Sequence, residues 1–89
     1  MKNVEIYTVN YCPYCFDAKK LLEKKQIKFK ELDITENEDE IKEKLKQYYN
    51  IQDPVTVPQI IISGQRIGGF DALKALDEKG ELDKLLNEE

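Results

Sequence analysis

The sequence predicts an α/β fold: a four-stranded mixed sheet with helices on both faces. Two observations carry this prediction. First, segments that alternate between apolar and polar residues are separated by segments with helical spacing, in the order strand, helix, strand, helix, strand, strand, helix. Second, the first strand–helix–strand unit favours a right-handed crossover between parallel strands, whereas the last two strands are close enough in sequence to pair as an antiparallel hairpin.

The first strand and first helix follow directly from the pattern. Residues 4–9 alternate and are rich in β-branched and aromatic side chains, which is typical of a strand. A helix is then expected to begin at Pro13, because a missing N–H costs nothing at the first helical position, and to run to about residue 25. Its expected apolar face consists of Cys15, Ala18, Leu21 and Leu22.

Residues 27–34 alternate again and are expected to form the second strand, with apolar positions at Phe29, Leu32 and Ile34. Thr35 and Glu38 have the spacing of a capping box, which predicts the start of a second helix. The apolar side chains of this helix at helical spacing are Ile41, Leu45 and Tyr48.

The second half of the chain predicts a hairpin followed by a helical region. Residues 58–62 are expected to form a short buried strand, and the turn at Ser63-Gly64-Gln65 leads into a return strand over residues 66–68. A helical region then begins at Phe70 or Asp71 and continues, after Gly80, through the last leucines.

Composition limits the kind of protein. The 89 residues are 40% hydrophobic and 36% charged, which indicates one folded domain over residues 1–89 rather than a disordered chain. No apolar run approaches the ~18 residues of a membrane helix, and Glu5 interrupts any apolar core of a secretory signal, so a cytoplasmic protein without membrane contact is expected. A net charge of -4 speaks against non-specific nucleic-acid binding.

The chain has no histidine and two cysteines, Cys12 and Cys15. The absence of histidine excludes Cys–His and Ser–His catalysis and any His-ligated metal. A bridge across so short a loop adds little stability, so in a reducing cytosol the pair is expected to be redox-active or metal-binding.

Cys12 is expected at the end of the first strand and the start of the first helix. The unpaired N–H groups of a first helical turn, together with the helix dipole, favour a thiolate there, and the thiolate is the attacking species. Residues at i and i+3 are neighbours on a helix, so Cys12 can attack a substrate disulfide and Cys15 can then displace the product. Two alternatives are weaker. Structural, unreactive cysteines fit poorly with Pro13 marking a helix start, and half of a zinc site would need a second chain to supply the missing ligands.

Three motifs in this order and spacing resemble the glutaredoxin family over essentially the whole chain. They are Cys12-Pro13-Tyr14-Cys15, Thr56-Val57-Pro58-Gln59-Ile60 and Ile67-Gly68-Gly69-Phe70-Asp71. The likeness is greatest to short bacterial dithiol glutaredoxins. It implies a thioredoxin-like fold, no permanently bound cofactor or metal, and glutathione as the reducing cosubstrate. It also implies a monomer that acts on disulfide-containing or glutathionylated proteins.

The resemblance also implies a glutathione site. Its members would be Tyr14, Thr56, Val57, Pro58, Gly69, Phe70 and Asp71. In the family the proline matching Pro58 is cis, the residue matching Val57 bonds the glutathione backbone, and the residue matching Asp71 pairs with the γ-glutamyl amino group. From the residues alone, Pro58 could simply begin a strand and Asp71 could simply cap a helix.

One position departs from the family pattern. Many glutaredoxins have lysine three residues before the nucleophile, where this chain has Val9. Lys19, Lys20 and Lys42 are candidates to replace that charge. Because this lysine is absent, a second function stays open: a glutaredoxin-like redoxin that is reduced by thioredoxin reductase. A scaffold that shares an iron–sulfur cluster between two protomers is less favoured, because relatives of that kind usually lack a proline at the position of Pro13.

Overall fold

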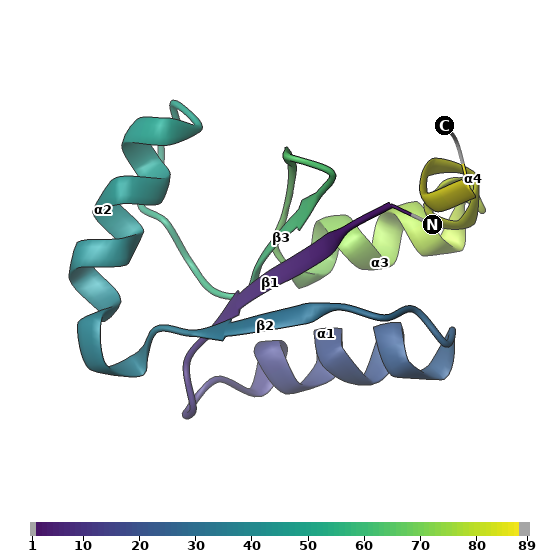
Figure 1. Ribbon diagram of the computed structural model, residues 1–89, viewed down its shortest axis with the longest axis horizontal. Helices are drawn as coiled ribbons and strands as arrows, with labels where there is room; N and C mark the ends of the chain where they lie inside the picture. Colours follow the sequence, from purple (N-terminus) through teal and green to yellow (C-terminus); the bar gives the residue numbers. More distant parts are fainter. Residues whose placement is uncertain (1, 88–89) are drawn as a thin grey trace.

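A four-stranded sheet in the order β2-β1-β3-β4 organises the molecule (Figure 1). The structure is a computed structural model that describes residues 2–87. Its elements are β1 (Val4–Thr8), α1 (Pro13–Lys24), β2 (Lys30–Asp33), the 3-10 turn η1 (Thr35–Asn37), α2 (Glu38–Tyr48), β3 (Gln59–Ile62), β4 (Gln65–Gly68), α3 (Phe70–Glu78) and α4 (Glu81–Asn87). The predicted domain also includes Met1, Glu88 and Glu89, which lie outside the described residues.

The sheet is mixed, as the sequence predicts. β1 runs parallel to β2, with Thr8 opposite Asp33, and antiparallel to β3, with Ile6 opposite Ile60. β3 and β4 form the expected hairpin. The two residues of its turn, Ser63 and Gly64, have φ values of 51° and 82°. Positive φ at both central positions suits the right-handed twist of the strands that the turn connects.

The main core lies between one face of the sheet and helices α1, α3 and α4. Its buried side chains are Val4, Ile6, Ala18, Leu22, Ile27, Ile60, Ile62, Leu73, Leu82 and Leu86. Lys25, at the end of α1, reaches Asp77 of α3 at 2.5 Å and Asp83 of α4 at 3.1 Å. These ion pairs join the three helices at one end of the core.

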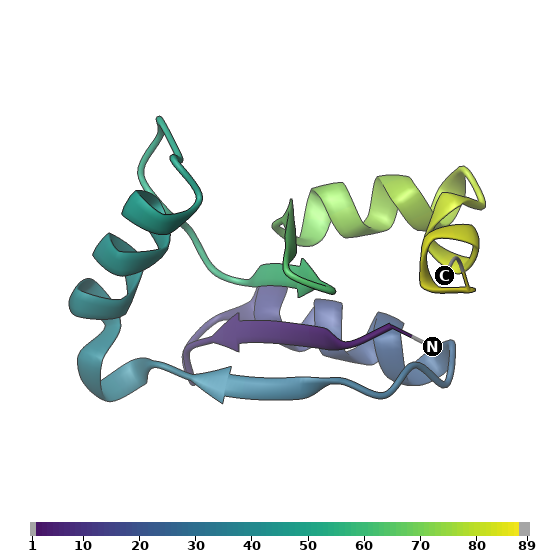
Figure 2. The same cartoon turned by 45° about the horizontal axis from the view of Figure 1, so that its top comes forward.

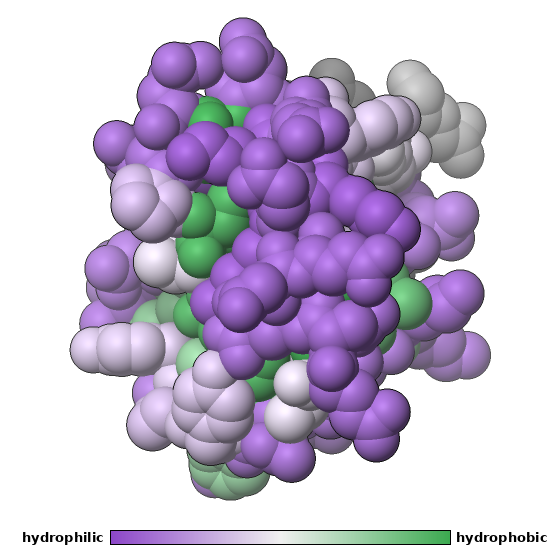
Figure 3. Space-filling model, turned by 90° about the vertical axis from the view of Figure 1, so that its left-hand side faces the viewer, coloured by the Kyte–Doolittle hydropathy of each residue, from purple (hydrophilic) through white to green (hydrophobic). Residues whose placement is uncertain are grey.

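Helix α2 lies by the other face and stands apart from the remaining helices (Figures 1 and 2). Ile41 and Leu45 of α2 line a hollow of about 500 Å³ together with Glu5 and Tyr7 of β1. Viewed from the side of α2, the surface is mostly hydrophilic, with apolar atoms visible in the gaps (Figure 3). The predicted placement of helices on both faces is therefore confirmed.

Three details of the prediction are wrong. β2 begins at Lys30 rather than at residue 27. Tyr48 lines the same hollow as Leu45 but is 80% exposed, so it is not a buried position of α2. The capping box does not form, because the hydroxyl of Thr35 accepts a hydrogen bond from the Asn10 N–H at 2.9 Å and donates to Asp33 instead. No side chain caps α2 at its N-terminus, and the helix begins after a 3-10 turn.

The starts of two helices agree with the sequence, since α1 begins at Pro13 and α3 at Phe70. The predicted last helical region is divided, because Gly80, with a φ of 73°, separates α3 from α4. Within residues 2–87, none of the helices combines the length and the apolar character that crossing a membrane requires.

Candidate active site

Cys12 is the N-cap of α1. Its backbone is extended, with φ -108° and ψ 109°, and Pro13 follows as the first helical residue. The Sγ atom accepts a hydrogen bond from the backbone N–H of Cys15 at 3.1 Å. The sulfur therefore faces a backbone N–H at the start of the helix. The side chain is partly exposed, so an incoming disulfide can reach it.

The loop before β3 meets Cys12 from the opposite side. The carbonyl oxygen of Val57 lies 3.6 Å from Cys12 Sγ and accepts the thiol hydrogen. The Val57–Pro58 peptide bond is cis, which confirms the expectation drawn from the resemblance. Residues 12 and 57, 45 positions apart in the sequence, thus form one surface.

Cys15 differs from Cys12 in its surroundings. It lies on the inner side of α1 with 2% of its surface exposed. Burial and the hydrogen bond with Cys12 raise the pKa of the Cys15 thiol to about 12. The two free thiols therefore have unequal access: a substrate meets Cys12 first, and Cys15 is reached only from within the protein.

A cleft of about 500 Å³ adjoins Cys12. Its lining residues are Tyr14, Thr56, Val57, Pro58, Gly69, Phe70, Asp71 and Ala72. All seven residues that the resemblance implied for glutathione thus line one cleft, and Ala72 adds an eighth. They come from α1, from the loop before β3 and from the first turn of α3.

Two physical features of this cleft suit a peptide-like anion. The ring of Tyr14 stacks with that of Phe70, with centroids 6.3 Å apart and planes at 25°, which forms one apolar wall. The first turn of α3 supplies N–H groups that have no partner within the helix. Asp71, in that same turn, is exposed and can meet a cationic group.

The lysines considered as replacements for the missing charge lie elsewhere. Val9 is 3% exposed, so its side chain belongs to the interior. Lys19 pairs with Glu31 at 2.9 Å, Lys42 pairs with Glu38, and Lys20 lies over the ring of Phe16 at 5.1 Å. No Lys or Arg is found among the described residues that line the cleft.

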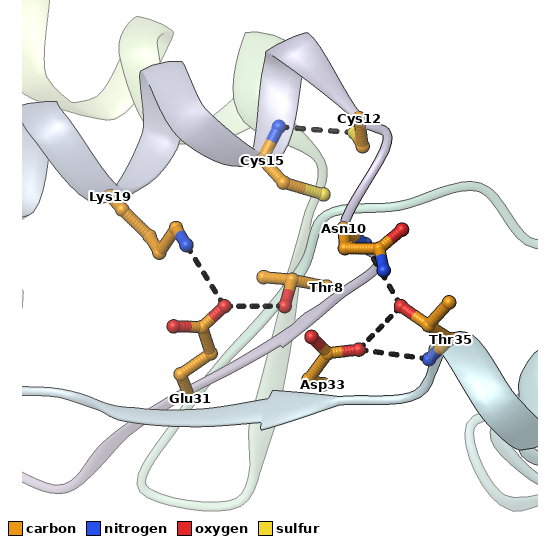
Figure 4. Close-up of polar contacts among 8 residues, drawn as sticks. All are labelled: Thr8, Asn10, Cys12, Cys15, Lys19, Glu31, Asp33 and Thr35. Carbon is orange, nitrogen blue, oxygen red and sulfur yellow. Dashed lines mark hydrogen bonds and ion pairs between the residues drawn. The ribbon is translucent and has the colours of Figure 1, made fainter.

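Sequence reasoning missed a polar network beside Cys15 (Figure 4). Glu31 Oε2 accepts hydrogen bonds from Thr8 Oγ1 at 2.7 Å and from Lys19 Nζ at 2.9 Å. These residues come from β2, β1 and α1, so no single segment carries the pattern. The one local signal for this network was the spacing of four residues between Cys15 and Lys19, which places both side chains on the same face of a helix. In the part of the chain that the structure covers, no three His, Cys, Asp or Glu side chains are grouped so as to hold a metal ion.

Comparison with known proteins agrees with this geometry. The glutaredoxin family model matches residues 4–67. Glutaredoxin 3 of Escherichia coli K12 is 50% identical over 86 residues, covering 97% of this chain and 99% of the relative. Glutaredoxin 1 of Rickettsia bellii is 44% identical over 81 residues, covering 91% of this chain and 83% of the relative.

Solved structures give the same result. The buckwheat glutaredoxin–glutathione complex has a TM-score of 0.84 at 26% identity and covers 96% of this chain and 76% of its own. Glutaredoxin 1 from Francisella tularensis, complexed with cacodylate, has a TM-score of 0.78 at 37% identity and covers 99% of this chain and 100% of its own.

Proposed function

The chain belongs to the glutaredoxin family and is a dithiol, glutathione-dependent disulfide oxidoreductase, and we propose that Cys12 is its nucleophile and Cys15 its resolving thiol. The observation that carries this assignment is the contrast between the two sulfurs. Cys12 is partly exposed and accepts an N–H at the start of α1, whereas Cys15 is buried one turn later.

The reaction begins at Cys12. Its thiolate attacks one sulfur of a substrate disulfide, forming a mixed disulfide and releasing the other sulfur as a thiolate that takes up a proton. The Cys15 thiolate then attacks the Cys12 sulfur, forming the Cys12–Cys15 disulfide and releasing the reduced substrate. One glutathione thiolate opens that disulfide to a mixed disulfide on Cys12, and a second releases oxidised glutathione and restores both thiols.

We place glutathione in the cleft beside Cys12. Its sulfur would lie near Cys12, and its backbone would pair with the main chain of Val57 in the manner of an added strand. The N–H groups at the start of α3 would receive the γ-glutamyl carboxylate, and Asp71 would pair with the adjacent amino group. The stacked rings of Tyr14 and Phe70 support the ligand as an apolar wall. The buckwheat relative was solved in complex with this same ligand.

The substrates we propose are protein disulfides and protein–glutathione mixed disulfides in the cytoplasm, handled by a monomer of one domain over residues 1–89. The absence of Lys and Arg from the described lining of the cleft implies that glutathione is held mainly through its γ-glutamyl end and backbone. No nucleic-acid or membrane partner is proposed.

The experiment is NADPH-coupled reduction of a small glutathione mixed disulfide with glutathione and glutathione reductase. Cys12→Ser should abolish the activity. Cys15→Ser should keep it, because reduction of a glutathione mixed disulfide requires only the Cys12 thiol of the protein. With a protein disulfide as substrate, Cys15→Ser should lose activity as well. Thioredoxin reductase serves as the second electron source. Activity with that reductase alone, or activity surviving in Cys12→Ser, would overturn the assignment, and a coloured purified protein would revive the cluster scaffold.

A further inference from the structure

Cys15 must lose a proton before it can resolve a mixed disulfide, because the thiolate is the attacking species. Its burial opposes this: the side chain is 2% exposed, and the pKa of its thiol is raised to about 12. Burial, which persists when Cys12 is in a mixed disulfide, therefore lowers the ionised fraction of Cys15. A nearby positive charge would raise that fraction and speed the second step of the reaction.

Lys19 is placed to supply such a charge. It follows Cys15 by four residues in α1, and residues at this spacing lie on one face of a helix, about 5–6 Å apart at their β-carbons. Figure 4 shows the Cys15 side chain pointing from α1 toward the strand that carries Thr8, while Lys19 reaches from the same helix to Glu31.

The position of the Lys19 ammonium is fixed by two strands. Nζ lies 2.9 Å from Glu31 Oε2, and the same oxygen accepts the Thr8 hydroxyl at 2.7 Å. Thr8, the last residue of β1, is 1% exposed and holds this carboxylate on the side toward which Cys15 points (Figure 4). The Lys19 side chain is itself only 29% exposed, which limits screening of its charge by water.

We propose that Lys19, held by Glu31 and Thr8, provides the positive charge that stabilises the Cys15 thiolate as Cys15 resolves the mixed disulfide on Cys12. This inference rests on the roles proposed above for the two cysteines. Lys19 touches neither substrate nor sulfur, so it is a positioning residue for the second step rather than a catalytic one.

Among the groups that affect the pKa of Cys15, Lys19 is the one that does so through a positive charge. On α1, Cys12 raises the pKa of Cys15, whereas the Lys19 charge lowers it, as does a hydrogen bond with the backbone of Val9 at the end of β1. Two acidic groups lie on β2, but each is already bonded. Glu31 directs Oε2 to hydrogen bonds from Lys19 and Thr8, and the pKa of Cys15 is lowered by the Lys19 charge. Asp33 accepts from the N–H and the hydroxyl of Thr35, away from Cys15. Asp71 of α3 is exposed in the cleft.

The chemical balance is simple. The Cys15 proton passes to water or buffer. The sulfur electron pair forms the bond to Cys12, the bond between Cys12 and the substrate sulfur breaks, and the departing thiolate takes up a proton. The two cysteines are oxidised and the substrate disulfide is reduced. Lys19 changes the rate of this step and leaves its stoichiometry unaltered.

The test is a stopped-flow reaction of the reduced protein with a symmetrical aromatic disulfide whose thiolate products are coloured. The first product reports attack by Cys12, and the second reports resolution by Cys15, so Cys15→Ser should show the first phase alone. Lys19→Met should slow the second phase about threefold to tenfold, which corresponds to a pKa change of about half a unit to one unit, and move its pH midpoint upward. The first phase should not change.

Matched variants separate charge from packing. Lys19→Arg should restore the second phase, and Lys20→Met, which removes the neighbouring charge over Phe16, should alter neither phase. Lys19→Met with Glu31→Gln removes both members of the ion pair and should remain slower than the parent, because the positive charge is gone. Urea unfolding of each variant establishes that it is folded during the assay, and Lys19→Gln is the second neutral variant if methionine unfolds the protein.

Three results would overturn the inference. They are a second phase in Lys19→Met as fast as that of the parent, a slowing that Lys19→Arg does not relieve, and a pH midpoint that does not move. A failure of the proposed function looks different, because the parent itself would then show no second phase, or Cys12→Ser would retain the first.

Discussion

Gly68 and Gly69 are adjacent, yet alanine should affect stability mainly at the first and glutathione binding mainly at the second. Gly68 has a φ of 121°, and a Cβ added there would lie 3.3 Å from the Cβ of Ala72. A side chain rarely adopts this backbone conformation, and holding a residue in such a sparsely populated region costs about 1–3 kcal/mol. Gly69 has a φ of -90°, and its added Cβ would lie 3.5 Å from the carbonyl oxygen of Pro58, an ordinary contact.

Gly68→Ala should therefore lower the free energy of unfolding by about 1–3 kcal/mol. In a domain of this size each 1 kcal/mol shifts Tm by roughly 4–8 °C, so the loss is easily measured. Gly69→Ala should cost about 1 kcal/mol or less: alanine is a poorer N-cap residue than glycine, but its backbone conformation there is not strained. Its methyl group, however, points at Pro58 in the glutathione cleft, so the KM for glutathione should rise while kcat is largely kept.

The assay pairs urea unfolding of both variants with glutathione-dependent turnover measured well below their midpoints. The reasoning about Gly68 is refuted if Gly68→Ala is as stable as the parent. A Gly69→Ala variant that loses more stability than Gly68→Ala would refute the geometric comparison. Gly64→Ala is the matched control for positive φ, because Gly64 has a φ of 82° with no atom within 4 Å of an added Cβ and lies away from the cleft.

Three further predictions concern single side chains. Asp71→Asn should raise the KM for glutathione by up to about fivefold with little change in kcat, because an exposed ion pair contributes at most about 1 kcal/mol; an unchanged KM in the coupled assay would argue against the γ-glutamyl contact. Leu22→Ala should lower the free energy of unfolding by about 2–5 kcal/mol, since Leu22 is 0% exposed, and denaturant unfolding checks this. The Thr8 hydrogen bond, followed by that of Lys19, holds the pKa of Glu31 below its ordinary 4.5. The stability this carboxylate adds is therefore present above about that pH and lost as pH falls through the lower, folded-state pKa. Glu31→Gln should be less stable than the parent at neutral pH, and a gap in urea unfolding that persists in acid would contradict the assignment.

The sequence predicted those features of the fold that short stretches determine. Pro13 as a first helical residue and a hairpin turn at Ser63-Gly64 depend on local backbone preferences, and both are found, although Gln65 of the predicted turn belongs to β4. The single last helical region predicted across Gly80 is instead divided into α3 and α4. The position of Cys12 as an N-cap followed from the same local logic. The cis bond before Pro58 had no local signal of comparable strength and came from the resemblance alone.

What the sequence did not predict depends on contacts between distant segments. Thr35 had a sound capping spacing, but Asn10 and Asp33, brought to it by the parallel pairing of β1 and β2, offered its hydroxyl other partners. Tyr48 had helical spacing with Leu45 and lines the same hollow, yet its side chain is 80% exposed. The bonds among Thr8, Lys19 and Glu31 likewise exist only once three elements are assembled.

The two outer strands of the sheet bear on how the protein behaves at high concentration. β2 and β4 form its edges, and an edge strand offers unpaired backbone groups on which another chain can add. On β2, the side chains of Lys30, Glu31 and Asp33 are solvent-accessible, and on β4 those of Gln65 and Arg66 are exposed. Charged and polar side chains at both borders are one of the features by which proteins discourage intermolecular strand addition.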